Sequence, residues 1–253
     1  MTTGPFVSVV IPVFNAERHL ASTLDSVLRQ GHDRLEIIVV DDGSTDGSAA
    51  IAARCGGPVR CLFQPNRGPP AARNAGFRMA RGELIAFLDA DDLWSEDRLA
   101  VQLGLLARHP DADLVAGRFQ WVRDEALPGE APRLTPRAAP RHPLSLGTAL
   151  LRRRLFTTVG ELDESLRLND DVDWYLRARE LGVAMLLHEE VVLWYRRHER
   201  NITNDQERGR EFYLTALKKS LDRRRAHPLD VAAPLPGWSD FTGPGAGIPR
   251  GGS

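Results

Sequence analysis

Over the first hundred residues, the pattern of apolar and polar positions alternates between short apolar runs and longer helix-period stretches. Apolar runs typical of buried strands cover residues 6–13, 35–40, 59–63 and 84–88. Helix-period spacing predicts helices over residues 16–30, 44–53 and 69–81. Pro69 and Pro70 suit the first turn of the last of these helices. Strands that alternate with helices indicate βαβ units, so the sequence predicts an α/β fold with a parallel sheet flanked by helices.

Beyond about residue 95 the pattern is less regular. We predict helices over residues 97–108, 145–156, 171–181 and 205–225. Strand signals cover residues 113–122, 183–187 and 191–196, the first as one strand or two. Five prolines between residues 125 and 143 predict a loop. We therefore expect one domain over residues 1–226, followed by a disordered Pro/Gly-rich tail over 227–253.

Composition narrows the function classes. The 253 residues carry a formal net charge of −1, which argues against a general nucleic-acid-binding protein. The apolar run from Val7 to Phe14 is too short to span a bilayer, and the first residues show no export signal. Cys55 and Cys61 match neither a zinc pair nor a redox pair. These features lead us to expect a cytoplasmic protein.

Polar residues follow the predicted strands at the point where each strand ends. Asn15 and Glu17 come after the first strand, residues 41–44 (Asp-Asp-Gly-Ser) after the second, and residues 89–92 (Asp-Ala-Asp-Asp) after the fourth. In an open parallel sheet, ligands bind outside the carboxyl ends of the strands. The alternative for residues 41–44 is a simple turn, since Asp, Gly and Ser are common turn residues.

The acidic group after the fourth strand indicates a metal site. Residues two apart on a strand point the same way, so we expect Asp89 and Asp91 to converge. Close like charges raise each other's pKa or require a cation. Mg²⁺ and Mn²⁺ use one or two carboxylates together with substrate phosphates, which fits this small cluster. The alternative is a structural turn.

A second acidic group, residues 169–173, has two interpretations. It is typical of a helix start, with Asn169 or Asp170 as the N-cap and acids favoured by the helix dipole. It also suits a general base that takes a proton from an acceptor hydroxyl. A phosphate-binding GxxxxGK[ST] loop is excluded, because no lysine occurs before Lys218.

Six segments, taken in order, resemble family 2 glycosyltransferases of the GT-A fold. They are Val9–Glu17, Val39–Asp46, Phe87–Asp92, Val159–Glu164, Asp170-Asp171 and Tyr195–His198. The resemblance covers roughly residues 6–200. It implies a single Rossmann-like domain, with a nucleotide-binding half over about 6–95, a smaller acceptor-binding half over about 96–200 and a C-terminal helix over about 204–225.

The resemblance also implies inverting transfer of a sugar from a nucleotide diphosphate, with a UDP-sugar expected and other nucleotides open. Carried over by position, its donor-binding residues are Pro12, Asn15, Glu17, Asp41, Asp42, Arg73, Asp89 and Ala90. Its Mn²⁺ or Mg²⁺ ligands are Asp91, Asp89 and His198. The expected base is Asp171. Asp170 stands where the family has Glu, which leaves open which of the two acids is the base.

Two other functions are alternatives: a non-catalytic nucleotide-sugar-binding protein and a haloacid-dehalogenase-type phosphatase. The phosphatase is disfavoured, because Leu93 replaces its Thr or Val and no lysine precedes Asp170. The acceptor class (glycan, lipid-linked, peptide or small molecule) stays open.

The C-terminal part of the chain, residues 196–225, contains ten basic and five acidic side chains. We expect its stripe of Leu214, Leu217 and Leu221 to pack on the core. The alternative is peripheral contact with an anionic membrane surface, at the inner face of the membrane.

Overall fold

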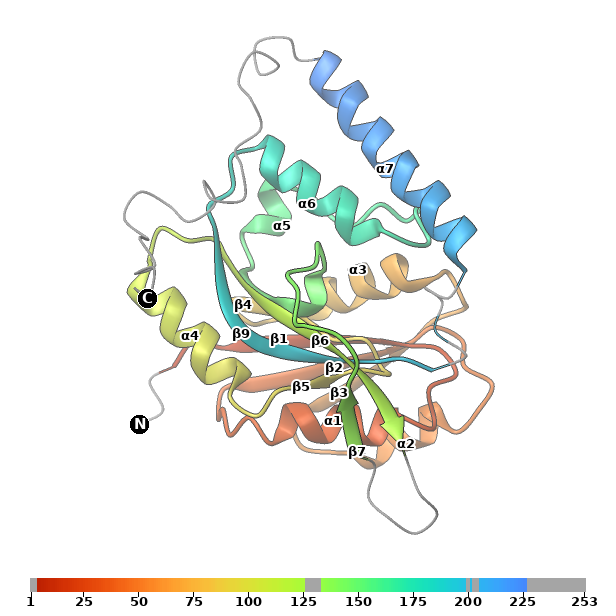
Figure 1. Cartoon of the computed structure of the whole chain (residues 1–253). Helices are drawn as coiled ribbons and strands as arrows, with labels where there is room; N and C mark the ends of the chain where they lie inside the picture. The colour runs from red at the N-terminus through yellow and green to blue at the C-terminus, as the bar shows by residue number, and fades with distance from the viewer. Residues whose placement is uncertain (1–3, 126–132, 199–200, 202–204, 227–253) are drawn as a thin grey trace.

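The computed structural model describes residues 4–125, 133–198, 201 and 205–226. These residues form three layers: a central sheet with a layer of helices on each face (Figure 1). Among the described residues the strand order is β3-β2-β1-β4-β8-β6-β9-β5, with β7 paired to β6. One helical layer holds α1, α2 and α4, and the other holds α3, α5 and α6. The predicted α/β fold, with helices on both faces of the sheet, is confirmed.

The first half contains the predicted parallel strands. They are β1 (Val7–Val13), β2 (Leu35–Asp41), β3 (Val59–Phe63) and β4 (Leu84–Phe87). The helices between them are α1 (Leu20–Leu28), α2 (Ser48–Arg54) and α3 (Pro69–Met79). Val7 pairs with both Leu35 and Leu84, so β1 lies between β2 and β4. Alternate β1 side chains face opposite layers, Val9 toward α1 and Val10 toward α3, because side chains alternate along a strand.

In the second half the added strands pair mainly in the antiparallel sense. They are β5 (Leu93–Trp94), β6 (Leu114–Glu125), β7 (Arg133–Pro136), β8 (Ala149–Arg152) and β9 (Met185–Arg196). The helices here are α4 (Arg98–Arg108), α5 (Leu155–Thr158), α6 (Asp170–Glu180) and α7 (Gln206–Ala226), with a 3₁₀ turn, η1 (Leu146–Thr148). β8 joins the two halves, since it is antiparallel to both β4 and β6.

Three predicted elements in this half, one helix and two strands, differ from the structure. The helix expected over 145–156 is a 3₁₀ turn, a buried strand and a short helix. A short apolar run has no distinguishing period, and here its residues fill the gap between β4 and β6. The two strands expected over 183–187 and 191–196 are one strand, β9, whose register against β6 shifts between Ala116 and Phe119.

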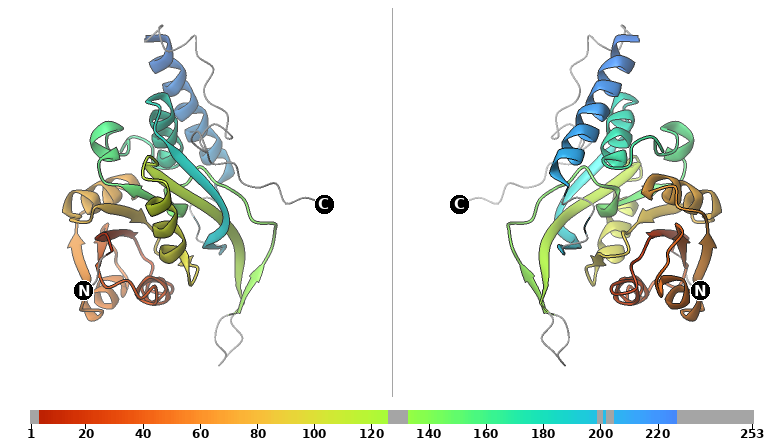
Figure 2. Two further views of the ribbon diagram at one scale, coloured as in Figure 1. Left: turned by 90° about the vertical axis from the view of Figure 1, so that its left-hand side faces the viewer. Right: turned by 90° about the vertical axis from the view of Figure 1, so that its right-hand side faces the viewer.

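The 125–143 stretch, expected to be a loop, contains the strand β7, and its residues 126–132 lie outside the described part. The predicted tail, residues 227–253, also lies outside it. None of the described helices has the length and apolar content that a membrane span needs. Helix α7 packs along α6 as the outermost element on that side (Figures 1 and 2).

Candidate functional site

The loops after β1 and β2 are joined to each other by side-chain hydrogen bonds. The Asn15 side-chain oxygen accepts from the Thr45 N–H at 2.8 Å, and the Glu17 carboxylate accepts from the Gly47 N–H at 2.8 Å. The Asn15 N–H donates to the Ser44 hydroxyl at 3.0 Å. The structure therefore brings Asn15 and Glu17 to the same rim as the loop after β2. Pro12, at the half-buried end of β1, pairs with Val40 of β2.

Asp41, the last residue of β2, and Asp42, which follows it, are both buried, and they differ in their partners. Asp41 accepts from the Ser44 N–H at 2.7 Å and so closes its own turn. Asp42 accepts from the N–H groups of Arg67 and Gly68, at 2.9 and 2.8 Å, and from the Gln64 amide at 2.7 Å. The Asp42 carboxylate thus fixes the loop before α3, and its donor-binding role stays a prediction.

Asp89 and Asp91 do not lie on a strand, because β4 ends at Phe87 and the next strand begins at Leu93. The prediction that Asp89 and Asp91 point the same way along a strand is therefore wrong. They lie in the turn between two strands, and each meets a different partner. Asp89 accepts from Arg73 at 2.6 Å, and Asp91 lies 3.1 Å from the His198 Nε2. Between them, the Ala90 carbonyl accepts from the Thr23 hydroxyl at 2.8 Å.

A buried acid and a buried arginine lie beneath this turn. Asp92 accepts from the Arg196 N–H at 3.0 Å, and the Arg196 guanidinium donates to the Ser22 and Thr23 hydroxyls and to the Asp91 carbonyl. Burial, together with the neighbouring Asp91 and Asp89 charges, raises the pKa of Asp92 well above its usual range. These contacts fix the turn from below and leave the Asp89 and Asp91 carboxylates partly exposed.

Arg73 of α3 connects the turn to helix α6. Its two terminal nitrogens donate to Asp89 at 2.6 Å and to Asp170 at 2.8 Å. The Arg73 side chain is mostly buried, and the two adjacent carboxylates raise its pKa, against the effect of burial. One arginine therefore holds an acid from each half of the chain.

Helix α6 begins with the second acidic group. Its N-cap, Asn169, has a left-handed backbone with φ 59°, and its side chain donates to the Gly209 carbonyl of α7 at 2.8 Å instead of capping the helix. Asp170 is 3% exposed and paired with Arg73, whereas Asp171 is only half-buried. Burial and the Asp170 charge raise the pKa of Asp171 to about 7. Such a carboxylate can accept a proton near neutral pH.

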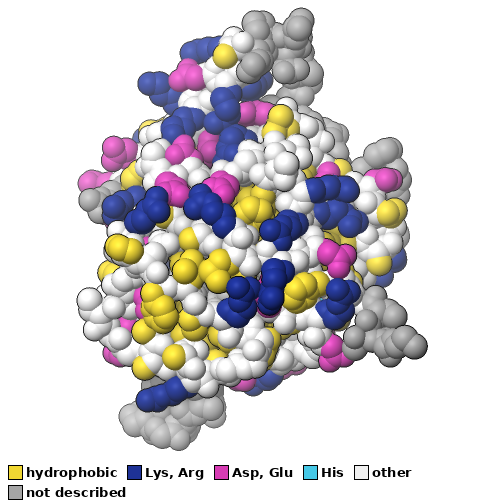
Figure 3. Space-filling model, turned by 180° about the vertical axis from the view of Figure 1, so that it is seen from behind, with side chains coloured by type: hydrophobic (Ala, Val, Ile, Leu, Met, Phe, Trp, Pro, Cys, Tyr) yellow, Lys and Arg dark blue, Asp and Glu magenta, His cyan; other side chains and the backbone are white. Residues whose placement is uncertain are grey.

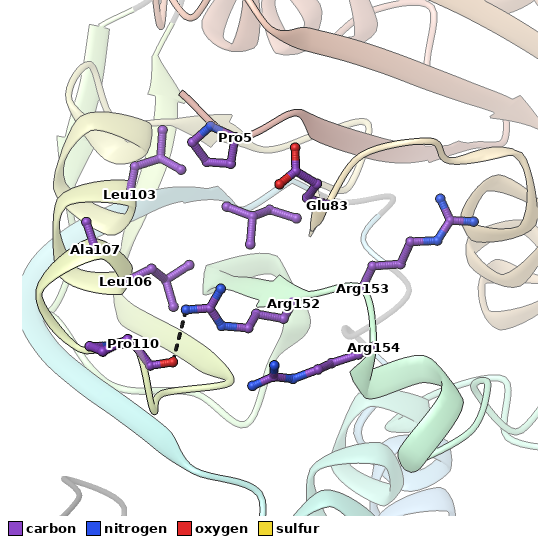
Figure 4. A pocket seen from close by; sticks show the side chains of 10 residues that line it. Pro5, Glu83, Leu103, Leu106, Ala107, Pro110, Arg152, Arg153 and Arg154 are labelled. Carbon is purple, nitrogen blue, oxygen red and sulfur yellow. Dashed lines mark hydrogen bonds between the residues drawn. The ribbon is translucent and has the colours of Figure 1, made fainter. Parts of the chain in front are cut away.

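A separate hollow of about 500 Å³ lies at the opposite ends of the strands, where β4 begins (Figure 4). Apolar side chains of α4 line it together with Glu83 and three consecutive arginines, Arg152–Arg154. Arg152 already donates to the carbonyls of Pro110 and Ala112, and Arg154 pairs with Asp113. The acidic turns follow the carboxyl ends of the strands, at the opposite end of the sheet, so this hollow is not part of the candidate active site.

The family model for glycosyl transferase family 2 matches residues 8–168, which include β1–β4 and the loops that form the rim. The chain belongs to glycosyl transferase family 2. This membership confirms the resemblance seen in the sequence, and it sets aside the phosphatase alternative.

Curated family 2 relatives cover different shares of the chain. An uncharacterized glycosyltransferase of Rickettsia typhi is 28% identical over 215 residues, which is 80% of this chain and 67% of that protein. An uncharacterized glycosyltransferase of Nostoc sp. is 43% identical over 97 residues, 37% of this chain and 30% of that protein. The chain thus spans only part of the length of these relatives.

Solved structures share the fold. S. aureus TarS 1-349 in complex with UDP-GlcNAc superposes with a TM-score of 0.65 at 20% identity, over 79% of this chain and 61% of that one. A mannosyltransferase from Pyrobaculum calidifontis, in complex with GDP-Man and Mn²⁺, gives a TM-score of 0.66 at 22% identity, over 87% and 65%. This family 2 chain therefore has the GT-A fold of both structures.

The expected metal ligands are only partly brought together. Among the described residues, no three His, Cys, Asp or Glu side chains are grouped closely enough to hold a metal ion by themselves. Asp91 and His198 do face each other, while one oxygen of Asp89 is bonded to Arg73. Two protein ligands completed by phosphate oxygens and water are a usual arrangement for Mg²⁺, so the donor set fits a cation that binds together with a diphosphate.

The candidate site also includes residues that the sequence analysis did not assign. Asn201 donates to the Asp91 carboxylate at 3.2 Å and to the Arg196 carbonyl at 3.1 Å, and it accepts from the His198 N–H. The His19 ring stacks on His198 with centroids 4.8 Å apart, and burial together with the Arg196 charge lowers the pKa of His19 to about 4. The spacing of Asn201, three residues after His198, was the signal that could have indicated this turn.

Proposed function

We propose that this protein transfers a sugar from a nucleoside-diphosphate donor to an acceptor hydroxyl, with inversion at the anomeric carbon. The Arg73 bridge carries the proposal. It ties Asp89, in the turn after β4, to Asp170, at the start of α6, and so holds the start of α6, with Asp171, against the turn that carries the proposed cation ligands. The side chains joined by Arg73 would then position both the leaving diphosphate and the proton acceptor, Asp171.

The rim formed by the loops after β1 and β2 is the proposed nucleoside site. Pro12, Asn15 and Glu17 border it, and Asp41 lies at its base. Phe14, which the sequence analysis did not single out, is 53% exposed there and offers an apolar surface to a base. We infer a UDP-sugar as the donor, and the UDP-GlcNAc bound to the structurally similar TarS supports that inference.

Asp91 and His198 are the residues that would hold Mn²⁺ or Mg²⁺ with the donor diphosphate. When bound there, a divalent ion would neutralise the charge that develops on the leaving nucleoside diphosphate. The chain's own contribution is positional: Asn201 and His19 fix the His198 side of the pair. Arg73 adds a fixed positive charge beside Asp89, on the other side of the turn.

Asp171, and not Asp170, is the proposed base. Asp170 is buried and its charge is engaged by Arg73, so it has no open side toward an acceptor. Asp171 is half-buried with a pKa of about 7, and it is the next residue on the same helix. Removal of the hydroxyl proton by Asp171 lets the acceptor oxygen attack the anomeric carbon directly, and a single displacement inverts its configuration.

A thermal-shift panel tests the donor assignment. UDP-GlcNAc, UDP-glucose and GDP-mannose are each added with Mn²⁺ or with EDTA. We expect the UDP-sugars to raise the melting temperature with Mn²⁺ only, and Asp91→Asn to remove most of the shift. Asp111→Asn, an exposed acid outside the rim, is the matched control and should behave like the unaltered protein. Equal shifts with Mn²⁺ and with EDTA would contradict the assignment of Asp91.

A turnover assay separates the enzyme from a non-catalytic binder. Release of UDP from a UDP-sugar, with and without a panel of acceptors, is compared between the unaltered protein and Asp171→Asn. Retained donor binding together with lost UDP release is the expected result for the variant. Donor binding by the unaltered protein without any turnover would favour the binder.

A further inference from the structure

Helix α7 packs on the domain through a different face from the one its leucines form. Its buried positions are Ala216 and Ser220, with Phe212 partly buried against the same cluster. On that side Arg223 donates to Asp173 at 2.9 Å and to Glu180 at 2.7 Å. The leucine stripe predicted to pack on the core therefore does not form the packing face.

The stripe instead faces outward. Leu214 is 54% exposed, Leu221 is 48% exposed and Tyr213 is 42% exposed, while Leu217 is half-buried. Large apolar side chains at this exposure, aligned on one helix, are uncommon on a surface that has no partner.

Basic side chains flank the stripe. Arg210, Lys218 and Arg225 lie three or four residues from the exposed leucines, so they share the outer side of the helix, and Arg224 borders it. Seen from behind, Lys and Arg side chains gather at the top of the molecule, where α7 lies, with Asp and Glu side chains among them (Figure 3). One acid, Glu207 in the first turn of α7, lies on this outer side as well, and Glu211 and Asp222 lie along one border of it, where Asp222 is 3.8 Å from Arg225. We name Arg210, Tyr213, Leu214, Leu217, Lys218, Leu221, Arg224 and Arg225 the outer face of α7.

We propose that the outer face of α7 docks on an anionic lipid bilayer, with the helix axis parallel to the membrane surface. The leucines and Tyr213 enter the boundary between headgroups and acyl chains, while the four basic side chains meet lipid phosphates. Anionic lipids supply the complementary charge, so the interaction weakens as salt screens it.

A second copy of the chain fits this face less well. A two-fold contact places the same surface on both partners, so the four basic side chains would meet their own copies. The apolar stripe also consists of only four side chains, far fewer than the roughly 20–30 residues a side that a stable protein interface uses. A bilayer has neither problem, because its charge is opposite and its surface is continuous.

Docking in this way would place the start of α6 behind α7, about 10 Å (one helix diameter) from the membrane surface. The Asn169 side chain donates to the Gly209 carbonyl in the first turn of α7, and Asp171 follows two residues later. If the proposed function holds, the base then lies where an acceptor carried by a lipid is presented. That consequence rests on the proposed function, whereas bilayer binding itself does not.

Vesicle flotation of the full chain tests the proposal. Phosphatidylcholine vesicles with and without 30% phosphatidylglycerol are compared at 50 and 500 mM NaCl. We expect flotation with the anionic vesicles at low salt, little with neutral vesicles, and release at high salt. The Leu214→Asn/Leu221→Asn variant and the Lys218→Gln/Arg225→Gln variant should each lose at least fivefold of the bound fraction.

Matched controls lie in the opposite helical layer. Leu28→Asn removes an exposed leucine from α1, and Arg29→Gln/Arg54→Gln removes two exposed charges from the ends of α1 and α2. Both should float like the unaltered protein, and all variants should keep its melting temperature, because every altered side chain is exposed.

Three results would overturn the proposal: no flotation with anionic vesicles at low salt, equal losses in outer-face and control variants, or a dimer in light scattering that Leu214→Asn/Leu221→Asn dissociates. The last result would assign the face to a second copy. Flotation needs neither donor nor turnover, so its failure leaves the proposed function intact, and a failed thermal-shift panel leaves bilayer binding intact.

Discussion

Asp42, in the rim formed by the loops after β1 and β2, and Asp170, at the start of α6, are equally buried acids, each 3% exposed, but they are held in different ways. Asp42 disperses its charge over two backbone N–H groups and one amide, with no cation. Asp170 depends on Arg73, which it shares with Asp89. The rim is therefore fixed by uncharged N–H groups, whose hydrogen bonds a bound ligand would leave unchanged. The start of α6 is instead held by ion pairs, which a bound diphosphate and cation would alter.

Asp171→Asn gives the largest effect that distinguishes the two regions. It removes the proposed proton acceptor, so kcat should fall about 1,000-fold, within the usual range for loss of a general base. The thermal shift caused by the donor should remain, because the rim is unchanged. Asp170→Asn is the comparison: if it abolishes turnover with the fold intact while Asp171→Asn keeps more than about a tenth of the activity, the base assignment is reversed.

The pH dependence of turnover tests the same carboxylate. Burial raises the pKa of Asp171 most, the Asp170 and Asp89 charges raise it further, and Arg73 and the Ser145 hydroxyl lower it; the net result is a pKa of about 7. Below that pH the protonated form cannot act as a base, so kcat should fall about tenfold per pH unit, or roughly 100-fold at pH 5. A rate that stays flat from pH 8 to pH 5 would contradict this assignment.

Stability should follow the opposite trend at this residue. The folded state keeps the Asp171 proton up to about pH 7, while the unfolded chain loses it near pH 4, so ionisation destabilises the fold as the pH rises between these values. Asp171→Asn should therefore melt at a higher temperature than the unaltered protein at pH 8, with the difference lost at pH 4. Melting curves at the two pH values, compared with those of Asp111→Asn, measure it.

Asp42→Ala addresses the rim alone. It leaves the buried Gly68 N–H without its acceptor, which costs about 1–3 kcal/mol, and it also removes the acceptor of the more exposed Arg67 N–H. We expect the free energy of unfolding to fall by about 3 kcal/mol in urea denaturation. Asp42→Asn keeps an acceptor oxygen and should lose less, and equal losses in the two variants would mean that charge, not geometry, holds the loop.

How well the sequence predicts each region depends on how far apart in the sequence its contacting residues lie. The rim was predicted because strand ends and turn residues are local signals, and Asp41, Asn15 and Glu17 follow apolar runs directly. The Arg73–Asp170 pair joins residues 97 apart, and Asn201 meets Asp91 across 110 residues. No local pattern encodes such pairs, so they required the folded chain.

Helix α7 shows a second reason why a prediction from the sequence can be wrong. Its periodicity correctly predicted a helix, and its leucines indicated the wrong packing face. Close approach to α6 is made by small side chains, Ala216 and Ser220, and by an arginine that pairs with acids of α6. Hydrophobic periodicity detects large apolar residues, so it cannot identify a face built from small and charged ones.

The smallest predicted effect concerns the connection between the two regions at residues 161–164. Asn74 exchanges two hydrogen bonds with the Leu162 backbone, each 2.9 Å long, and is buried. Arg67 pairs with Glu164 at 2.7 Å in a mostly exposed position. Exposed ion pairs contribute about 0–1 kcal/mol, so Arg67→Ala should lower the free energy of unfolding by less than about 1 kcal/mol and lose that effect in 0.5 M NaCl. Asn74→Ala, measured in parallel, should cost at least twice as much at either salt concentration.

A larger, salt-sensitive loss from Arg67→Ala would mean that charge holds this connection as it holds α6, and the contrast between the two regions would then fail.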